Sequence, residues 1–392
     1  MISLFSLLAF SLPAIAAFVH PGALHTTKDL VRIKSHVVNE DEPWSTTWTL
    51  LTSSSFARAA YVPTPQKTVY RGYNGVNAEN YQYLYRDAAA AYQLALRWLI
   101  SGDTSYADAA VNILSSWAVT LTAISGTSDR YLASGLYGYQ MANAAELMRS
   151  YSGWASSNKT ATTKMLTNIF APMNTVFLED HDGKGDYIFY ANWDQCNIAS
   201  LLAIGIFTDN QTMFDYAIDY ARSGPANGAL PVFDIANYAE AGSGKTLTQG
   251  QEAGRDQGHA TLDIMLLGVI AQQAYNQGID LFATYKNEIL NAAEYVGKYN
   301  VGYSVPYTPY ESYEGDQTVI SATSRGNIRP GFELISAHYG QLKRLNSSWS
   351  DAYRDMVNAN STSGVEGGGG NYATTSGGFD SLGFGTLVYR LS

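Results

Sequence analysis

The sequence predicts an all-α protein, and the arrangement it favours is an α/α toroid, an incomplete barrel of helical hairpins around a central cleft or tunnel. Apolar residues recur at helical spacing through most of the 392 residues. The helical runs come in pairs joined by short polar turns, which is typical of antiparallel neighbours. An array of hairpins encloses a cleft if it curls until its ends meet, and an open superhelix is the alternative.

The first hairpin is the clearest, because two amphipathic runs, 81–100 and 106–121, flank the turn Ser101-Gly-Asp-Thr104. The other predicted helices are 135–151 with 164–178, 197–207 with 211–223, 259–277 with 281–299, and 332–345 before a last helix at 349–358. The tail 364–385 is rich in glycine and poor in charge. We expect it to form a surface loop followed by a short strand or a packed terminal segment.

The N-terminal residues resemble a cleaved secretory signal peptide, with an uncharged apolar run from Leu4 to Ala17 that ends in small residues. This run is short for a membrane span, and no later stretch has about 18 uninterrupted apolar residues. We therefore expect a signal peptide at residues 1–17 and a secreted, extracellular protein that does not bind membranes. No linker divides the rest, so residues 18–392 are expected to form one domain. We also expect the protein to be a monomer.

Sequons and cysteine usage agree with this setting. Four sequons fit a eukaryotic secretory route and predict surface loops at Asn158, Asn210, Asn346 and Asn360. The lone Cys196 cannot form an internal disulfide, so the core must hold the fold by itself. No cation adjoins Cys196 in sequence, and we expect a buried, inert thiol.

Charge and aromatic content limit the classes of ligand that the protein could bind. The formal net charge of −10 argues against a nucleic-acid partner. An acidic substrate would need a local cluster of cationic and amide groups that overrides the overall field. The 29 tyrosines and seven tryptophans suit stacking on carbohydrate, although a large helical core would use them equally well.

The run 252–259 is the most informative motif, because it gathers two carboxylates, a guanidinium and an imidazole in Glu252, Arg255, Asp256 and His259. It lies between a Gly/Ser/Thr-rich loop and an apolar stretch that predicts a buried helix. Glu252 and Arg255, like Arg255 and His259, are one helical turn apart and can converge. A binding site is favoured over a helix cap with a solvated face, which is the structural alternative.

A second patch, 187–197, is expected just before a helix. There Asn192 can hydrogen-bond a carboxylate while Trp193 stacks on a sugar ring. The structural alternative is an Asn or Asp helix cap above a buried tryptophan.

A third patch, 305–313, is irregular because its two prolines forbid helix and stiffen the tyrosines Tyr307, Tyr310 and Tyr313. Such segments on a rigid scaffold often carry function, although packing is the commoner role of any single tyrosine.

The last patch begins at Arg325 and includes Arg329, both candidates for substrate binding. Pro330 is expected to begin a helix in which Arg329 pairs with Glu333, which leaves Arg325 freer to bind an anion. His181 has no second histidine at a ligand spacing, so no metal is expected there.

Four segments together resemble the alginate-lyase-like superfamily of polysaccharide lyases: Tyr-Ala-Asn192-Trp193, Glu252-Ala-Gly-Arg255-Asp-Gln-Gly-His259, Lys298-Tyr-Asn300 and Arg329-Pro-Gly-Phe-Glu333. The sequence is most similar to the glucuronan and alginate lyases of polysaccharide lyase family 38, with a fungal origin. The resemblance implies an α/α toroid and β-elimination of uronate chains by Asn, His, Arg and Tyr residues. Related alginate lyases carry Asn-His where this chain has Asn192-Trp193, so the histidine role would pass to His259.

Elimination demands that donors neutralise the uronate carboxylate while the C5 proton leaves. Asn192, Arg255 and His259 can supply them, with Glu252 orienting the cations and Trp193 forming a sugar platform. In β-linked glucuronate or mannuronate, one tyrosine can take the C5 proton and then protonate O4, leaving a C4=C5 double bond.

The candidates for this tyrosine are Tyr310 and Tyr313, then Tyr307. An ordinary tyrosine pKa of about 10 requires nearby positive charge, which Arg255, Arg325 or His259 can provide. No metal or other cofactor is required.

Two other function classes stay open at this point. A glycoside hydrolase of toroid type would need two carboxylates flanking the bond, and Asp194, Glu252 and Asp256 can furnish them. Hydrolysis does not explain the arginine, histidine and amide donors nearby. A non-catalytic protein that binds acidic glycans is the third interpretation.

Overall fold

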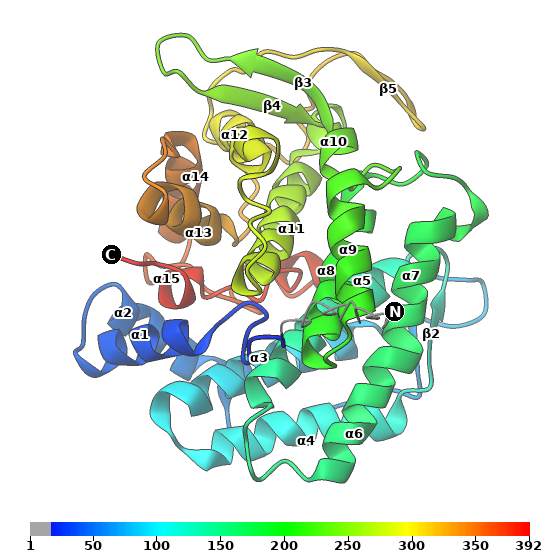
Figure 1. Ribbon diagram of the computed structural model, residues 1–392, viewed down its shortest axis with the longest axis vertical. Helices are drawn as coiled ribbons and strands as arrows, with labels where there is room; N and C mark the ends of the chain where they lie inside the picture. Colours follow the sequence, from blue (N-terminus) through cyan, green and yellow to red (C-terminus); the bar gives the residue numbers. More distant parts are fainter. Residues whose placement is uncertain (1–16) are drawn as a thin grey trace, which may run out of the picture.

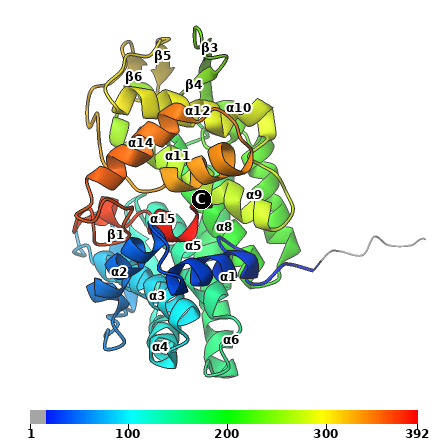
Figure 2. The same ribbon diagram turned by 90° about the vertical axis from the view of Figure 1, so that its left-hand side faces the viewer.

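The computed structural model describes residues 17–392, and most of these residues are helical (Figures 1 and 2). The predicted signal peptide, residues 1–17, therefore lies outside the described residues except for Ala17. In the first part of the described chain the helices are α1 (Thr27–Val38), α2 (Trp44–Ser53), α3 (Gln82–Ser101), α4 (Thr104–Thr120), α5 (Arg130–Met148), α6 (Ser156–Met165), α7 (Ala171–Asp180), α8 (Ala191–Phe207) and α9 (Gln211–Ser223).

The second part continues with α10 (Leu230–Phe233), α11 (Gln257–Asn276), α12 (Thr284–Asn300), α13 (Phe332–Ile335), α14 (Ser348–Ala359) and α15 (Gly385–Val388). Two π-helical segments join these elements: Leu166–Phe170 links α6 to α7, and Ser336–Leu342 extends α13. A short 3-10 helix, η4 (Gln251–Gly254), leads into α11.

The predicted hairpins are confirmed with shifted ends. In the turn between α3 and α4, Asp103 caps the N-terminus of α4, and its side chain accepts a hydrogen bond from the backbone N–H of Ser105. Helix α8 begins at Ala191, six residues before the predicted start at position 197, so the prediction that Asn192 precedes the helix is wrong. The tail ends in the packed helix α15 and not in a strand.

The chain is mainly helical, as predicted, but the all-α prediction did not include the three two-stranded sheets that accompany the helices. The strands are β1 (Thr68–Arg71), β2 (Ala123–Gly126), β3 (Asp234–Ala239), β4 (Thr246–Gly250), β5 (Tyr310–Ser312) and β6 (Gly315–Gln317). They are too short for alternation of apolar and polar residues to reveal them. In addition, β1 and β2 pair in parallel across a long stretch of sequence.

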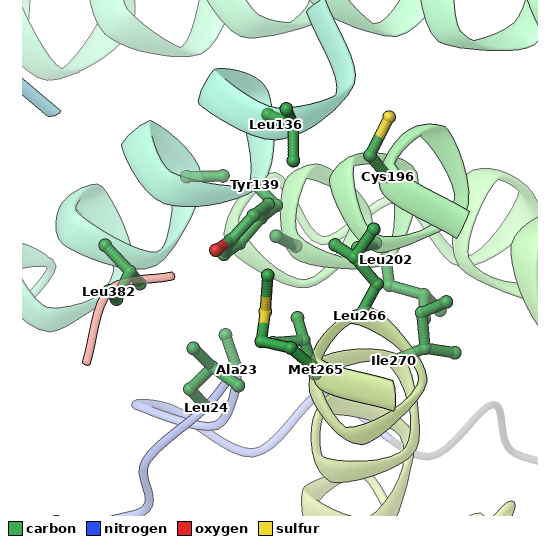
Figure 3. Packing of buried hydrophobic residues seen from close by; sticks show 14 of the residues in the cluster. Ala23, Leu24, Leu136, Tyr139, Cys196, Leu202, Met265, Leu266, Ile270 and Leu382 are labelled. Atoms are coloured by element: carbon green, nitrogen blue, oxygen red, sulfur yellow. The ribbon is translucent and has the colours of Figure 1, made fainter. Parts of the chain in front are cut away.

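The core is formed where α5, α8 and α11 meet (Figure 3). On α5, a Cβ at Gly135 would lie 2.4 Å from the Cys196 Sγ on α8, so the absence of a side chain allows the two helices to approach closely. Cys196 is fully buried, as predicted, and burial raises the pKa of its thiol. Tyr139 crosses this core and donates from its hydroxyl to the carbonyl of Asp380 in the tail.

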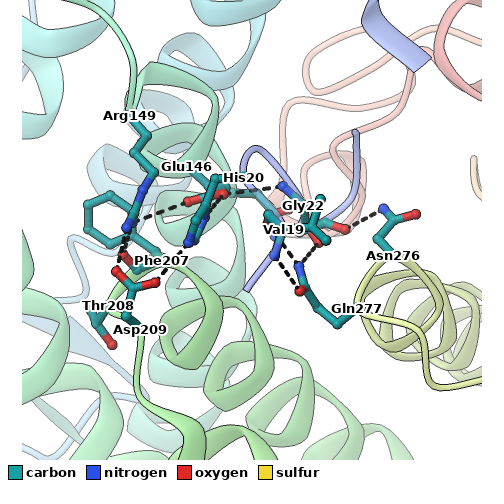
Figure 4. A network of polar contacts seen from close by, with 12 residues as sticks. Val19, His20, Gly22, Glu146, Arg149, Phe207, Thr208, Asp209, Asn276 and Gln277 are labelled. Carbon is teal, nitrogen blue, oxygen red and sulfur yellow. Dashed lines mark hydrogen bonds and ion pairs between the residues drawn. The ribbon is translucent and has the colours of Figure 1, made fainter. Parts of the chain in front are cut away.

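Residues 19–23 are tied into the body by a polar network (Figure 4). His20 bridges Glu146 on α5, at 2.6 Å, and Asp209 in the α8–α9 turn, at 2.8 Å. The hydrogen bond to Glu146 raises the pKa of His20. Gln277, the residue that follows α11, accepts from the Val19 N–H at 2.9 Å. The start of the described chain thus connects helices from both parts of the protein.

The predicted surface loops at the four sequons are correct only in part. Asn346 and Asn360 are exposed, whereas Asn210 caps α9 and Asn158 lies within α6.

No helix within residues 17–392 combines the length and apolarity that crossing a membrane requires.

Candidate active site

The site is organised around Glu252 of η4, which is only 1% exposed. Asn192, in the first turn of α8, donates from Nδ2 to Glu252 Oε1 at 2.8 Å. Arg255 donates from Nη1 to both Glu252 oxygens, at 3.1 and 3.2 Å. The predicted convergence of Glu252 and Arg255 is therefore confirmed, and the fold brings Asn192 to the same carboxylate.

Burial raises the pKa of Glu252 to about 7 from its ordinary value of 4.5, although Arg255 and Asn192 act in the opposite direction. The carboxylate therefore changes its charge near neutral pH.

Arg255 lies between this buried acid and the surface. Its side chain is 25% exposed, and its Cζ lies 4.2 Å from the ring centroid of Tyr190. Its Nε is 3.9 Å from Glu314. Within residues 17–392, Nη1 is the only guanidinium nitrogen of Arg255 that donates a hydrogen bond. Part of the guanidinium is consequently free to meet an anion.

His259 lies in the first turn of α11, three residues after the N-cap Asp256. Asp256 Oδ1 accepts from the backbone N–H of His259 at 3.0 Å and lies 3.4 Å from its Nδ1. Asp256 is thus a helix cap, as the structural alternative predicted, but this role does not exclude a binding site formed by the other residues of the 252–259 run. The His259 side chain is 41% exposed. Burial and then the charge of Arg255 lower the pKa of His259, so a neutral imidazole predominates at neutral pH.

The hydroxyls of Tyr307 and Tyr310 are committed to the backbone. Tyr310 donates to the carbonyl of Gln251 and accepts from the N–H of Gly254 at 3.2 Å. Tyr307 donates to the carbonyl of Gln317 at 2.9 Å. Both rings therefore attach the β5–β6 hairpin to its surroundings.

Tyr313 is the candidate tyrosine nearest to solvent. It is 52% exposed, and its hydroxyl donates to Glu314 at 3.1 Å. Its ring packs edge-on against Tyr190, with centroids 5.5 Å apart. Since Tyr190 also lies against Arg255, Tyr313 is within the surroundings of the guanidinium.

Sequence reasoning missed Tyr190, although it lies two residues before Asn192. Its hydroxyl donates to Glu314 at 2.9 Å, and burial raises its pKa to about 12. Asp263 on α11 was also missed by sequence reasoning. Its two carboxylate oxygens are buried and have no hydrogen-bond partner within the described chain. The available signal for Asp263 was a single acidic residue within an apolar helix.

A further arginine, Arg71 of β1, was also missed. It donates to the Tyr137 hydroxyl at 3.1 Å and lies over the ring of Tyr81 at 5.0 Å. Asp380, whose charge acts on Arg71, forms an ion pair with Arg329 at 3.0 Å. Nothing in the local sequence marks Arg71, because its partners lie on distant elements.

The predicted pair of Arg329 and Glu333 is wrong. Helix α13 begins at Phe332, beyond Pro330, so Arg329 is outside the helix and lacks the geometry of one helical turn. Arg329 pairs instead with Asp380, and the buried Glu333 accepts from Arg390 Nη2 at 2.5 Å.

Arg325 is exposed but partly occupied. Its Nε and Nη2 donate to the carbonyls of Tyr299 and Tyr303 at 2.8 and 2.9 Å. Trp193 packs on Phe177 and Phe189, with ring centroids 5.9 and 4.6 Å away. This packing matches the structural alternative for Trp193, a tryptophan packed beneath the start of a helix, more closely than a free sugar platform.

Within residues 17–392 no group of three or more His, Cys, Asp or Glu side chains is arranged to hold a metal ion. His181 is buried, with Nε2 2.9 Å from Asp194 Oδ1 and Nδ1 3.3 Å from Asp186.

A cavity of about 460 Å³ adjoins Tyr190. Its walls come from the segment before α8, from α10 and β3, from η4 and from the β5–β6 hairpin. The lining residues are Tyr187, Ile188, Tyr190, Asn227, Val232, Ile235, Gln251, Tyr310, Glu311, Ser312 and Tyr313.

Comparison with known protein families identifies the family of the chain. The family model described as alginate lyase matches residues 35–303, a span that contains Asn192, Arg255 and His259. The chain belongs to the alginate lyase family. It is therefore a polysaccharide lyase. No curated protein sequence matches the chain.

Alginate lyases also share the fold. Alginate lyase A1-III from Sphingomonas species A1 has a TM-score of 0.61 at 16% identity, covering 98% of this chain and 100% of that one. A variant of alginate lyase A1-III complexed with a tetrasaccharide has a TM-score of 0.62 at 14% identity, covering 96% and 97%. An alginate lyase from Bacteroides ovatus has a TM-score of 0.61 at 13% identity, covering 88% and 98%.

Proposed function

We propose that this lyase is a secreted, monomeric enzyme that cleaves β-1,4-linked uronate polymers, glucuronan or polymannuronate-type alginate, by β-elimination. The observation that carries the proposal is the convergence of Asn192 and Arg255 on Glu252, directly beside Tyr190 and Tyr313. Family membership supports the reaction type. The helices would form an incomplete α/α toroid with this site in its cleft.

The first requirement of elimination is neutralisation of the substrate carboxylate. Arg255 offers its unused guanidinium N–H groups, and His259 offers a neutral imidazole as a second donor. Asn192 is only 2% exposed and donates to Glu252. In this proposal Asn192 therefore acts through Glu252, by fixing the carboxylate that orients Arg255.

The second requirement is proton transfer, for which we select Tyr313, because the hydroxyls of Tyr307 and Tyr310 are tied to the backbone. The Tyr313 phenolate takes the C5 proton, the C4–O4 bond breaks as C4=C5 forms, and the resulting hydroxyl gives this proton to the departing O4. Burial and then the contact with Glu314 raise the pKa of Tyr313, and the charge of Arg255 acts in the opposite direction. A uronate that displaces Glu314 from the Tyr313 hydroxyl would remove one of the contacts that raise this pKa.

The three carboxylates of the hydrolase alternative are each engaged elsewhere. Asp194 is buried, and it contacts His181 and accepts from the N–H of Gly228 at 2.8 Å. Glu252 holds Arg255 and Asn192, and Asp256 caps α11. None is thus an exposed acid of the kind that hydrolysis needs.

Incubation with a panel of uronate polymers tests the proposal, reading ultraviolet absorbance of the C4=C5 bond together with product length. Arg255→Ala and His259→Ala should each lower kcat/KM by at least about 100-fold, because the developing negative charge loses a donor. Arg58→Ala, a change at an exposed arginine, is the matched control and should keep full activity. Products without a double bond would instead indicate hydrolysis, and binding without product would indicate a non-catalytic protein.

A further inference from the structure

The cavity beside Tyr190 differs in charge from the Arg255 site that it adjoins. Among residues 17–392, the side chains that line it include no Lys, Arg or His. Its one charged lining residue is the acidic, exposed Glu311, and Glu314 lies close by on the same hairpin. A carboxylate placed in this cavity would therefore meet negative charge and no cation among the lining side chains.

Two of the lining residues, Gln251 and Asn227, carry amide oxygens that can accept a hydrogen bond. Gln251 Oε1 is buried and has no hydrogen-bond partner within the described chain. Asn227 donates from Nδ2 to the carbonyl of Phe189 at 2.6 Å, which leaves its Oδ1 as a further acceptor. Buried acceptors of this kind are satisfied by hydroxyl donors and not by another carboxylate.

The remaining wall is aromatic and apolar. The Tyr310 hydroxyl is held by Gln251 and Gly254, and the Tyr190 hydroxyl donates to Glu314, so these rings present mainly their faces and edges. Val232 adds an aliphatic surface. Aromatic walls with a few fixed polar atoms are typical of pockets for small polar ligands such as sugars.

We propose that this cavity is a subsite for an uncharged pyranose that adjoins the uronate held at Arg255. Tyr190 connects the two places, since it carries Arg255 over its ring and also lines the cavity. Among β-1,4-linked polymers that contain uronate, the enzyme would then prefer those in which a neutral sugar neighbours the uronate at the cleaved linkage over glucuronan and polymannuronate, which it would cleave less efficiently. The preference in turnover rests on the proposed function, whereas the binding of a neutral sugar in the cavity does not depend on it.

Two matched polymers test the preference: fully C6-oxidised cellulose, which is a polyglucuronate, and partially oxidised cellulose, in which glucuronate is flanked by glucose. The wild-type enzyme should show a kcat/KM per uronate about tenfold higher on the mixed polymer. Val232→Lys places a cation in the cavity wall and should reverse this preference. Val119→Lys, at an exposed site on α4, should leave it unchanged. Equal turnover of both polymers by all three proteins would overturn the inference.

Binding of a neutral β-1,4-linked glucose tetrasaccharide to the Arg255→Ala variant, measured by calorimetry, separates the inference from the proposed function. Binding that weakens about tenfold on adding Gln251→Leu supports the subsite, because the unpaired acceptor is lost. No detectable binding, or binding unaffected by Gln251→Leu, overturns it. If no polymer yields an unsaturated product, the proposed function fails while this measurement still decides the subsite.

Discussion

At the scale of single residues, the site depends on a buried acid beneath an exposed cation. Glu252 holds Arg255 in place while remaining shielded from solvent itself. Asp263 lies nearby on α11, and burial together with the charge of Glu252 raises its pKa well above the usual range. Two buried acids that influence each other favour retention of a proton, which limits the negative charge behind Arg255.

This arrangement predicts a pH-dependent stability. The folded-state pKa of Glu252 is raised from 4.5 to about 7, so its favourable contribution is complete below pH 4.5 and is lost as pH rises to about 7. Glu252→Gln should remove this loss, so that the unfolding free energies of variant and wild type diverge by up to about 1.4 kcal/mol per pH unit. Urea titrations across this window measure the effect. Parallel pH profiles of the two proteins would contradict it.

At the scale of elements, the β5–β6 hairpin is docked on η4 at a glycine. A Cβ at Gly254 would lie 2.5 Å from the Tyr307 hydroxyl, 2.6 Å from Gln317 Cβ and 3.1 Å from the Tyr310 hydroxyl. Only a residue without a side chain allows the hairpin to lie this close. The hairpin also carries Tyr313, so its docking sets the position of the proposed proton-transfer residue.

Gly254→Ala should therefore displace the hairpin and reduce kcat on the order of 100-fold, since displacements of about 1 Å can cost that much. The change in unfolding free energy should be small, because the hairpin is a peripheral element. Steady-state kinetics and thermal unfolding together test this.

Gly377→Ala is the matched control, because a Cβ there would meet nothing within 4 Å. Wild-type kcat in Gly254→Ala would show that the position of the hairpin does not matter for turnover.

At the scale of the whole molecule, the residues after the tail, 386–390, connect α1 to α13. Arg32 of α1 donates to the carbonyl of Val388 at 2.8 Å. Glu333 of α13 accepts from Thr386 at 2.6 Å and from Arg390. The final residues thus join the first helices to the last ones, next to the core crossed by Tyr139.

Glu333→Ala should lower the free energy of unfolding by roughly 3 kcal/mol, because it leaves Arg390 and Asn358 without their buried acceptor. Glu311→Ala, at an exposed carboxylate, should change it by less than about 0.5 kcal/mol. Urea unfolding measures both. A loss confined to activity would show that the tail does not hold the ends together.

Several features of the fold and site were readable from sequence because they depend on neighbours along the chain. The hairpin of α3 and α4 follows from helical spacing and the Asp103 cap. The pairing of Glu252 with Arg255 follows from one helical turn. Errors arose where the exact start of a helix mattered, as at Arg329, since local patterns place helix ends only within a few residues.

Periodicity, composition and short spacings are local properties, and they suffice to predict a mainly helical protein without internal disulfides and with a charged cluster at 252–259. The contact of Asn192 with Glu252, the position of Tyr190 against Arg255 and the cavity that adjoins them emerge from tertiary packing alone. These contacts join residues about 60 or more positions apart. Their geometry is set by how whole helices pack, which no short stretch of sequence specifies.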